Sequence, residues 1–122
     1  MKMYSFEKLD VWQKTRELTK DIFILTKKFP DEERFGLTSQ LRRAIISVSC
    51  NIAEGTSRWS NKERVRFMEI AFSSLMEVLN CLIISFDLQL IDENALIDLR
   101  KKIDKISNKL NALSKSFKRM DN

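Results

Sequence analysis

The sequence of 122 residues contains no histidine. This absence removes the most common general base and the most common metal ligand of proteins, including the Glu-x-x-His motif of di-iron bundles. The only glycines are Gly36 and Gly55, so the sequence has neither a glycine-rich phosphate loop nor a serine flanked by glycines. We therefore expect no catalytic residues, no metal and no cofactor, and predict that the protein is not an enzyme.

Turn-forming residues are also scarce, because the sequence has two glycines and one proline. Such a composition disfavours an all-β domain, while 43% hydrophobic residues are too many for a disordered chain. A chain of this length can bury one core but not two. The composition predicts a single all-α domain over residues 1–122.

The two cysteines, Cys50 and Cys81, have neither metal-ligand spacing nor the density of a disulfide framework. We interpret both as small core residues in a reducing compartment. The first ten residues mix charged and apolar side chains, unlike a signal peptide, and no apolar run approaches the roughly 20 residues of a membrane span. We expect a cytoplasmic protein without a membrane partner.

Apolar residues repeat three and four apart in four segments, the pattern of amphipathic helices. The first segment is expected to begin with Asp10 as its N-cap and to end at Pro30, and Gly55 is the expected left-handed C-cap of the second. Ser60 and Asp92 are the expected N-caps of the third and fourth. Because the connections are short, the sequence predicts an antiparallel, up-down-up-down four-helix bundle.

The third segment has more apolar residues than one buried face requires. Either this helix is central in the bundle or it contacts another subunit. The additional apolar residues are Val65, Phe67, Ile70, Met76, Val78, Ile83 and Ile84.

The fourth segment carries most of the positive charge. Residues 100–119 hold eight basic residues and one acidic residue, whereas the rest of the chain holds fourteen basic and sixteen acidic residues. A basic stripe of this kind is typical of a nucleic-acid partner, bound mainly through its phosphates. The alternatives are an acidic protein, a membrane surface, or a solvated face that maintains solubility. The basic residues are Arg100, Lys101, Lys102, Lys105, Lys109, Lys115, Lys118 and Arg119.

Arg58 and Trp59 precede the third segment, with Lys62, Arg64 and Arg66 just beyond. An exposed aromatic ring among cations can stack on an unpaired base. The simpler interpretation is that Trp59 anchors the connection by packing against the bundle.

A polar stripe runs along the second segment, away from its apolar residues. Three interpretations apply: a site combining Glu54 with Arg42 or Arg43, a solvated face, or a subunit contact, which we favour because a single glutamate makes a poor active site. The stripe consists of Gln40, Arg43, Ser47, Asn51 and Glu54.

Several residues of the first two segments form a recognisable pattern. They are Leu9, Val11-Trp12-Gln13, Phe29-Pro30, Glu33, Phe35-Gly36-Leu37, Gln40-Leu41-Arg42-Arg43-Ala44 and Asn51-Ile52-Ala53-Glu54-Gly55. With them the chain resembles the four-helix-bundle proteins encoded in intervening sequences of bacterial large-subunit ribosomal RNA genes. The resemblance implies a homopentameric ring with no established enzymatic activity. Ser49-Cys50 and Ser73-Ser74 depart from the family pattern, which has a proline and a Gly-Ser pair there.

A more remote similarity links the chain to the accessory variability proteins of diversity-generating retroelements. Those proteins form basic rings that bind nucleic acid and a reverse transcriptase. The similarity favours a ring-forming scaffold that binds RNA or DNA without sequence specificity. The alternative is a module that binds another protein and no nucleic acid.

Overall fold

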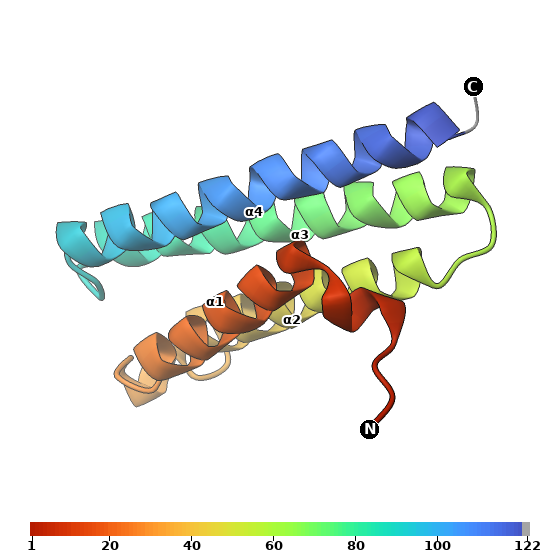
Figure 1. Cartoon of the computed structure of the whole chain (residues 1–122). Helices are drawn as coiled ribbons and strands as arrows, with labels where there is room; N and C mark the ends of the chain where they lie inside the picture. Colours follow the sequence, from red (N-terminus) through yellow and green to blue (C-terminus); the bar gives the residue numbers. More distant parts are fainter. Residues whose placement is uncertain (121–122) are drawn as a thin grey trace.

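The structure, a computed structural model, describes residues 1–120, and all the regular secondary structure in that range is helical. Figure 1 shows neighbouring helices running antiparallel, so the predicted all-α four-helix bundle is confirmed. The elements are η1 (Ser5–Lys8), α1 (Asp10–Thr26), η2 (Asp31–Glu33), α2 (Leu37–Thr56), α3 (Asn61–Asp87) and α4 (Glu93–Met120), where η marks a 3-10 helix.

Two of the predicted N-caps are confirmed. The Oγ of Ser60 accepts a hydrogen bond from the backbone N–H of Glu63 at 3.1 Å, and the Oδ1 of Asp92 accepts one from Ala95 at 2.8 Å. The prediction for Asp10 is wrong, because this residue is already helical and Leu9 is the N-cap, without a side-chain cap. The carboxylate of Asp10 instead lies beside α4.

A second expectation, that Gly55 is the left-handed C-cap of α2, is wrong. Gly55 is a residue of α2 with a negative φ. A Cβ at this position would lie 2.6 Å from the Cβ of Phe67 and 2.6 Å from the Cε of Met68. Glycine is therefore needed here because α2 and α3 approach each other closely, a reason that does not involve a turn.

The wide apolar face of α3 is explained by its two neighbours, since α3 packs against both α2 and α4. Val78 is buried and most of the other additional apolar residues are half-buried, whereas Ile70 and Ile84 are each 39% exposed. By length and composition alone α3 is long and apolar enough to cross a membrane, although Glu77 interrupts its apolar residues, so no run of about 20 is present. In the bundle, the apolar residues of α3 form its contacts with α2 and with α4.

The cysteines differ from each other, although both are free. Cys81 is buried, as expected of a core residue, and its burial together with the nearby charge of Glu77 raises the pKa of its thiol. Cys50 is exposed on α2, so the expectation of a second core cysteine is wrong. It lies between Val48 and Ile52 in sequence but on the outward side of the same helix.

Candidate nucleic-acid interface

The buried residues of α4 determine which of its basic side chains face outward. Because successive residues of a helix are about 100° apart, Lys101, Lys105, Lys115 and Arg119 lie opposite the buried line, and all four are exposed. They extend over about 27 Å at 1.5 Å per residue. We call these four residues the outer basic row. The buried line consists of Leu96, Leu99, Ile103, Ile106, Leu110 and Phe117.

Two of the predicted basic residues form salt bridges with acidic residues of the same chain. The Nζ of Lys102 lies 2.8 Å from the Oδ2 of Asp21 and 3.3 Å from that of Asp98, and the Nζ of Lys109 lies 2.5 Å from the Oδ2 of Asp10. The hydrogen bond to Asp21 raises the pKa of Lys102, and the hydrogen bond from Lys109 lowers the pKa of Asp10. We call Lys102 and Lys109 the paired edge.

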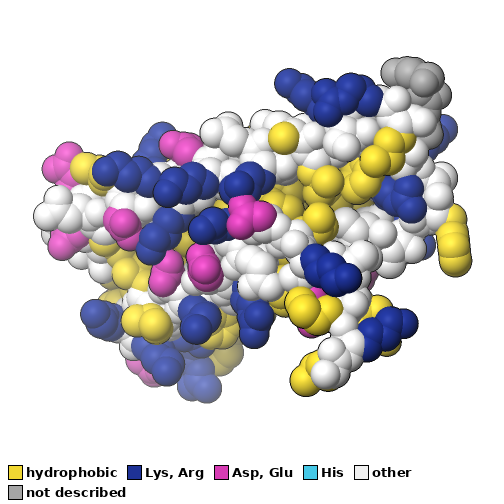
Figure 2. Space-filling view, viewed as in Figure 1, with side chains coloured by type: hydrophobic (Ala, Val, Ile, Leu, Met, Phe, Trp, Pro, Cys, Tyr) yellow, Lys and Arg dark blue, Asp and Glu magenta, His cyan; other side chains and the backbone are white. Residues whose placement is uncertain are grey.

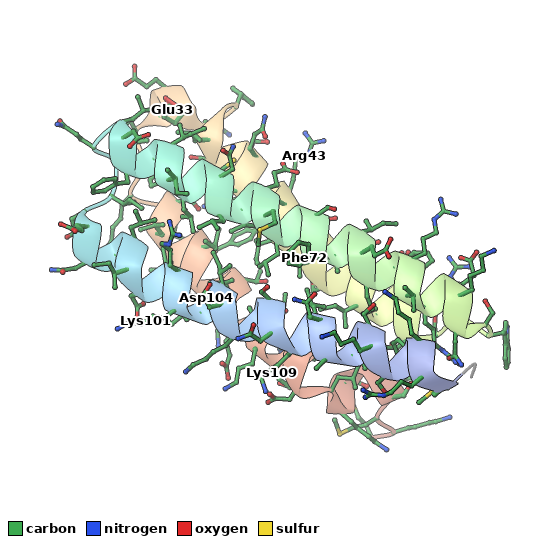
Figure 3. All side chains as sticks on the ribbon, turned by 90° about the horizontal axis from the view of Figure 1, so that it is seen from above. Glu33, Arg43, Phe72, Lys101, Asp104 and Lys109 are labelled. Carbon is green, nitrogen blue, oxygen red and sulfur yellow. The ribbon has the colours of Figure 1, made fainter. Side chains whose placement is uncertain are left out.

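The pairing separates two sides of α4. Asp10 and Asp21 belong to α1, so the paired edge faces that helix, and Figure 2 shows acidic side chains among basic ones along this boundary. Within residues 1–120, Lys102 and Lys109 are the members of the predicted basic set that form salt bridges. Figure 3 shows Lys101, Asp104 and Lys109 along α4, and Asp104 is the one acidic residue of residues 100–119. The outer basic row is therefore the part of the stripe most open to a polyanion.

Arg100 and Lys118 flank the outer row on the side towards α3, and both are exposed. Lys118 also lines a shallow groove between α3 and α4 with a volume of about 240 Å³. Phe72 lies in this groove, and Figure 3 shows it between the two helices. The α3 side of the groove carries Glu69, so the basic surface ends at Lys118.

Trp59 does not anchor the connection between α2 and α3, because the residue is 97% exposed. Arg58 turns towards α3 instead, where its guanidinium lies 4.6 Å from the ring centroid of Phe67. The guanidinium of Arg64 lies 5.7 Å from the ring centroid of Phe117, near the end of α4. The structure therefore brings the α2–α3 connection and the last turns of α4 to one end of the bundle, as Figure 1 shows.

The polar stripe of α2 is divided into half-buried residues and exposed residues. The hydroxyl of Ser47 lies 2.9 Å from that of Ser74 on α3, and the Nδ2 of Asn51 donates to the carbonyl oxygen of Ser47 at 2.8 Å. These two side chains are half-buried between α2 and α3. The other members of the stripe, Gln40, Arg43 and Glu54, are exposed.

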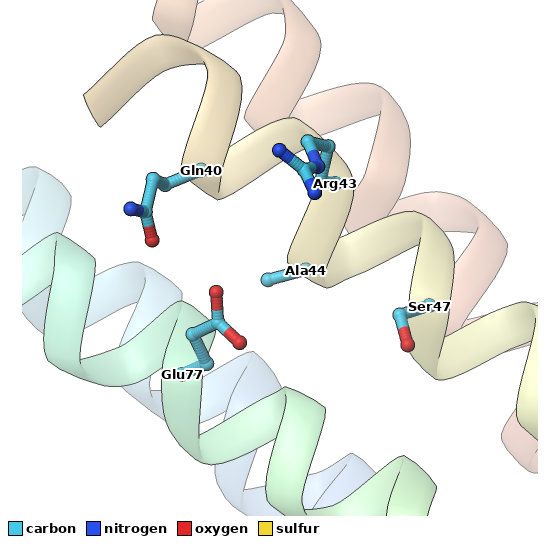
Figure 4. Close-up of a pocket in the computed structure, with 5 residues that line it drawn as sticks. All are labelled: Gln40, Arg43, Ala44, Ser47 and Glu77. Atoms are coloured by element: carbon cyan, nitrogen blue, oxygen red, sulfur yellow. The ribbon is translucent and has the colours of Figure 1, made fainter. Parts of the chain in front are cut away.

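A shallow polar pocket of about 360 Å³ lies beside this stripe. Figure 4 shows Gln40 and Arg43 of α2 on one side and Glu77 of α3 on the other. Glu77 was not predicted as a site residue. The one local signal is its position seven residues from both Ile70 and Ile84, which places the three residues on one side of α3.

The glutamate–arginine site considered for an enzyme is not assembled. Arg42 turns towards α1, where its Nε donates to the Oγ1 of Thr26 at 2.9 Å and its guanidinium lies over the ring of Phe23. Glu54 does not line the pocket beside Arg43. Within residues 1–120 there is also no cluster of three or more side chains that could hold a metal ion.

The model of the 23S rRNA-intervening sequence protein family matches residues 7–112. A similar solved structure is the crystal structure of a protein with unknown function from the S23 ribosomal protein family of Bacteroides thetaiotaomicron VPI-5482. The two chains share 22% identity with a TM-score of 0.79, over 86% of this chain and 98% of that chain. This likeness shows the common fold alone. No curated protein matches the chain.

Proposed function

We propose the following function for this chain, which belongs to the 23S rRNA-intervening sequence protein family: a non-enzymatic cytoplasmic scaffold that assembles into a homopentameric ring and binds RNA or DNA without sequence specificity. The observation that supports nucleic-acid binding is the outer basic row of α4. Its four cations project away from the bundle over about 27 Å and have no acidic partner within residues 1–120.

The outer basic row suits phosphate recognition and not base reading. Cations on one outer side of a helix can neutralise successive phosphates and release their counterions, which gives affinity without sequence preference. If each of the four residues contacts one phosphate, the slope of log Kobs against log salt is about −3 for a single strand and about −4 for duplex DNA.

The proposed subunit contact lies on the α2–α3 side. Arg43 and Glu77 provide opposite charges there, and Ile70 and Ile84 provide exposed apolar area. Because α2 makes no direct packing contact with α4 in the described bundle, assembly through the α2–α3 side leaves the outer basic row accessible. A ring and a nucleic-acid surface are thus compatible on the same chain.

Ile70 and Ile84 also support a second candidate function. Exposed apolar side chains on one side of a helix are typical of a protein-binding surface. In that case the ring, or a single copy, binds another protein through α3, and the basic row of α4 serves solubility. A complex with a protein partner that survives nuclease treatment would favour this function.

The test compares two pairs of substitutions with the same change of charge. Lys101→Gln with Lys105→Gln removes half of the outer basic row, whereas Lys102→Gln with Lys109→Gln removes the paired edge. Binding to labelled single- and double-stranded RNA and DNA is measured across a salt series. We expect the first pair to reduce the salt slope by about 1.4 for single strands and about 1.8 for duplex DNA, and the second pair to reduce it much less.

Two other results would count against the proposal. If the wild-type protein binds none of the four nucleic acids at low salt, the basic row has another role. If the paired-edge variant loses as much slope as the outer-row variant, binding reflects net charge and not the outer row. Light scattering of Arg43→Glu tests the ring separately, with loss of the oligomer as the expected result.

A further inference from the structure

We propose that the end of the bundle where α3 begins and α4 ends binds a single-stranded polynucleotide, with the indole of Trp59 stacking on an unpaired base. This inference rests on the proposed function, because it presumes that the protein binds nucleic acid. It adds the type of strand and the place where a base is contacted.

Trp59 is unusually exposed for a tryptophan. Tryptophan is highly buried on average in proteins, yet Trp59 is 97% exposed. The connection that carries it is nevertheless ordered by hydrogen bonds. The Oγ of Ser57 donates to the carbonyl oxygen of Glu54 at 2.7 Å, the N–H of Arg58 donates to that of Gly55 at 3.1 Å, and Ser60 caps α3. The indole is thus presented on a structured turn, which reduces the entropy lost on stacking.

The segments around the indole of Trp59 are positively charged. Within residues 57–67 and 112–120 there are seven basic residues and one acidic residue, Glu63. The two segments are joined by the contact between Arg64 and Phe117. An aromatic surface within a basic field is the usual combination for binding single strands, because the cations follow the backbone and the ring stacks on a base. The basic residues are Arg58, Lys62, Arg64, Arg66, Lys115, Lys118 and Arg119.

The opposite end of the bundle provides an internal comparison. Phe35 is 89% exposed there, and the guanidinium of Arg34 lies 5.5 Å from the centroid of its ring. However, residues 27–36 and 87–93 together contain six acidic and three basic residues. This end has an exposed aromatic ring beside an arginine but a negative surrounding charge, which repels phosphates. Of these two ends, the Trp59 end is the one whose described residues combine the ring with a positive field.

The preference for single strands follows from the geometry of stacking. Bases of a duplex are already stacked on each other, so an indole can reach a base face only where the strand is unpaired. The outer basic row makes no such distinction, since phosphates are present in both forms. Single strands should therefore gain affinity from Trp59, whereas duplexes should not.

The experiment measures binding of a labelled 12-nucleotide oligo(dT), an oligo(U) of equal length and a duplex of equal length to the wild-type protein and to three variants. We expect Trp59→Ala to weaken binding of both single strands about 5- to 150-fold, corresponding to the loss of one stacked base, and duplex binding less than twofold. Trp59→Phe should retain part of the affinity. Phe35→Ala, the matched control at the acidic end, should bind like the wild type.

Fluorescence gives a direct readout of the contact. The chain has two tryptophans, so Trp12→Phe leaves Trp59 as the only indole. We expect single strands to quench this emission and to protect it from acrylamide. Thermal unfolding and light scattering of Trp59→Ala should match the wild type, because the exposed side chain contributes little to the core.

The outcomes distinguish this inference from the function on which it rests. If the wild-type protein binds neither strand type at low salt, both fail. If it binds both types and Trp59→Ala changes neither affinity, the scaffold function stands and the stacking site is overturned. If Trp59→Ala dissociates the oligomer, the indole is a subunit contact and the stacking site is overturned as well.

Discussion

Gly55→Ala provides a quantitative test of the close approach between α2 and α3. Alanine is favoured over glycine within a helix by about 1 kcal/mol, so propensity alone predicts a more stable protein. Against this, the new Cβ would lie 2.6 Å from the Cβ of Phe67, an atom fixed to the backbone of α3, and 2.6 Å from the flexible Cε of Met68. Carbon atoms pack at about 3.5–4.0 Å, so the two helices must separate by about 1 Å.

The expected net effect of Gly55→Ala is a loss of stability. Overpacking of a core typically costs about 1–3 kcal/mol, and here the strain falls on the most extensive helix contact of the bundle. Because the Cβ of Phe67 cannot rotate away, we take the upper part of this range, about 2–3 kcal/mol. After subtraction of about 1 kcal/mol for propensity, we expect the free energy of unfolding to decrease by about 1–2 kcal/mol. For a chain of this size that corresponds to a melting temperature about 4–8 °C lower.

The assay is thermal and urea unfolding followed by circular dichroism. Cys50→Ala is the matched control, since it also places alanine in α2 but on the exposed side, and it should be neutral or stabilising by less than about 0.7 kcal/mol. If Gly55→Ala is as stable as the wild type or more stable, the helices can separate without cost. Our explanation for the glycine would then be wrong.

Two further predictions concern titratable groups. A thiol reagent should modify Cys50 in the native protein but modify Cys81 only on unfolding, because burial hides this thiol and raises its pKa; modification of both in the native state would contradict the structure. The lowered pKa of Asp10 in the folded state means that its pairing with Lys109 stabilises the protein above the ordinary carboxyl pKa of 3.8 and that this contribution is lost as pH falls through the folded pKa. The stability difference between wild type and Asp10→Asn, measured by urea unfolding, should therefore shrink as pH is lowered below 3.8, and a difference independent of pH would refute the pairing.

The helices could be predicted from the sequence because their signals are local. The three–four repeat of apolar residues defines the buried side of α4, and a serine or aspartate just before a helix can cap it without help from the rest of the chain. Ser60 and Asp92 therefore behave as predicted. Asp10 does not, since its position before an apolar repeat is also compatible with a place inside the first turn.

The features that escaped prediction depend on contacts between distant segments. A glycine near the end of a helix has the same local pattern whether it forms a left-handed cap or, like Gly55, allows a second helix to approach. The pairing of Lys102 with Asp21 joins residues 81 positions apart, so the basic stripe could not be divided into a paired edge and an outer row from the sequence. The exposure of Trp59 likewise depends on how α2, α3 and α4 meet.

The unequal charge of the two ends gives the bundle an electric dipole along its length. The field of a polyanion attracts the protein and also exerts a torque on it. The protein therefore approaches the polyanion with the Trp59 end forward before any contact forms. In a cyclic ring whose bundles run along the symmetry axis, every copy has the same orientation. The proposed ring would then have one positive and one negative face, and at low ionic strength such rings would attract each other head to tail, in stacks that dissolve as salt is added.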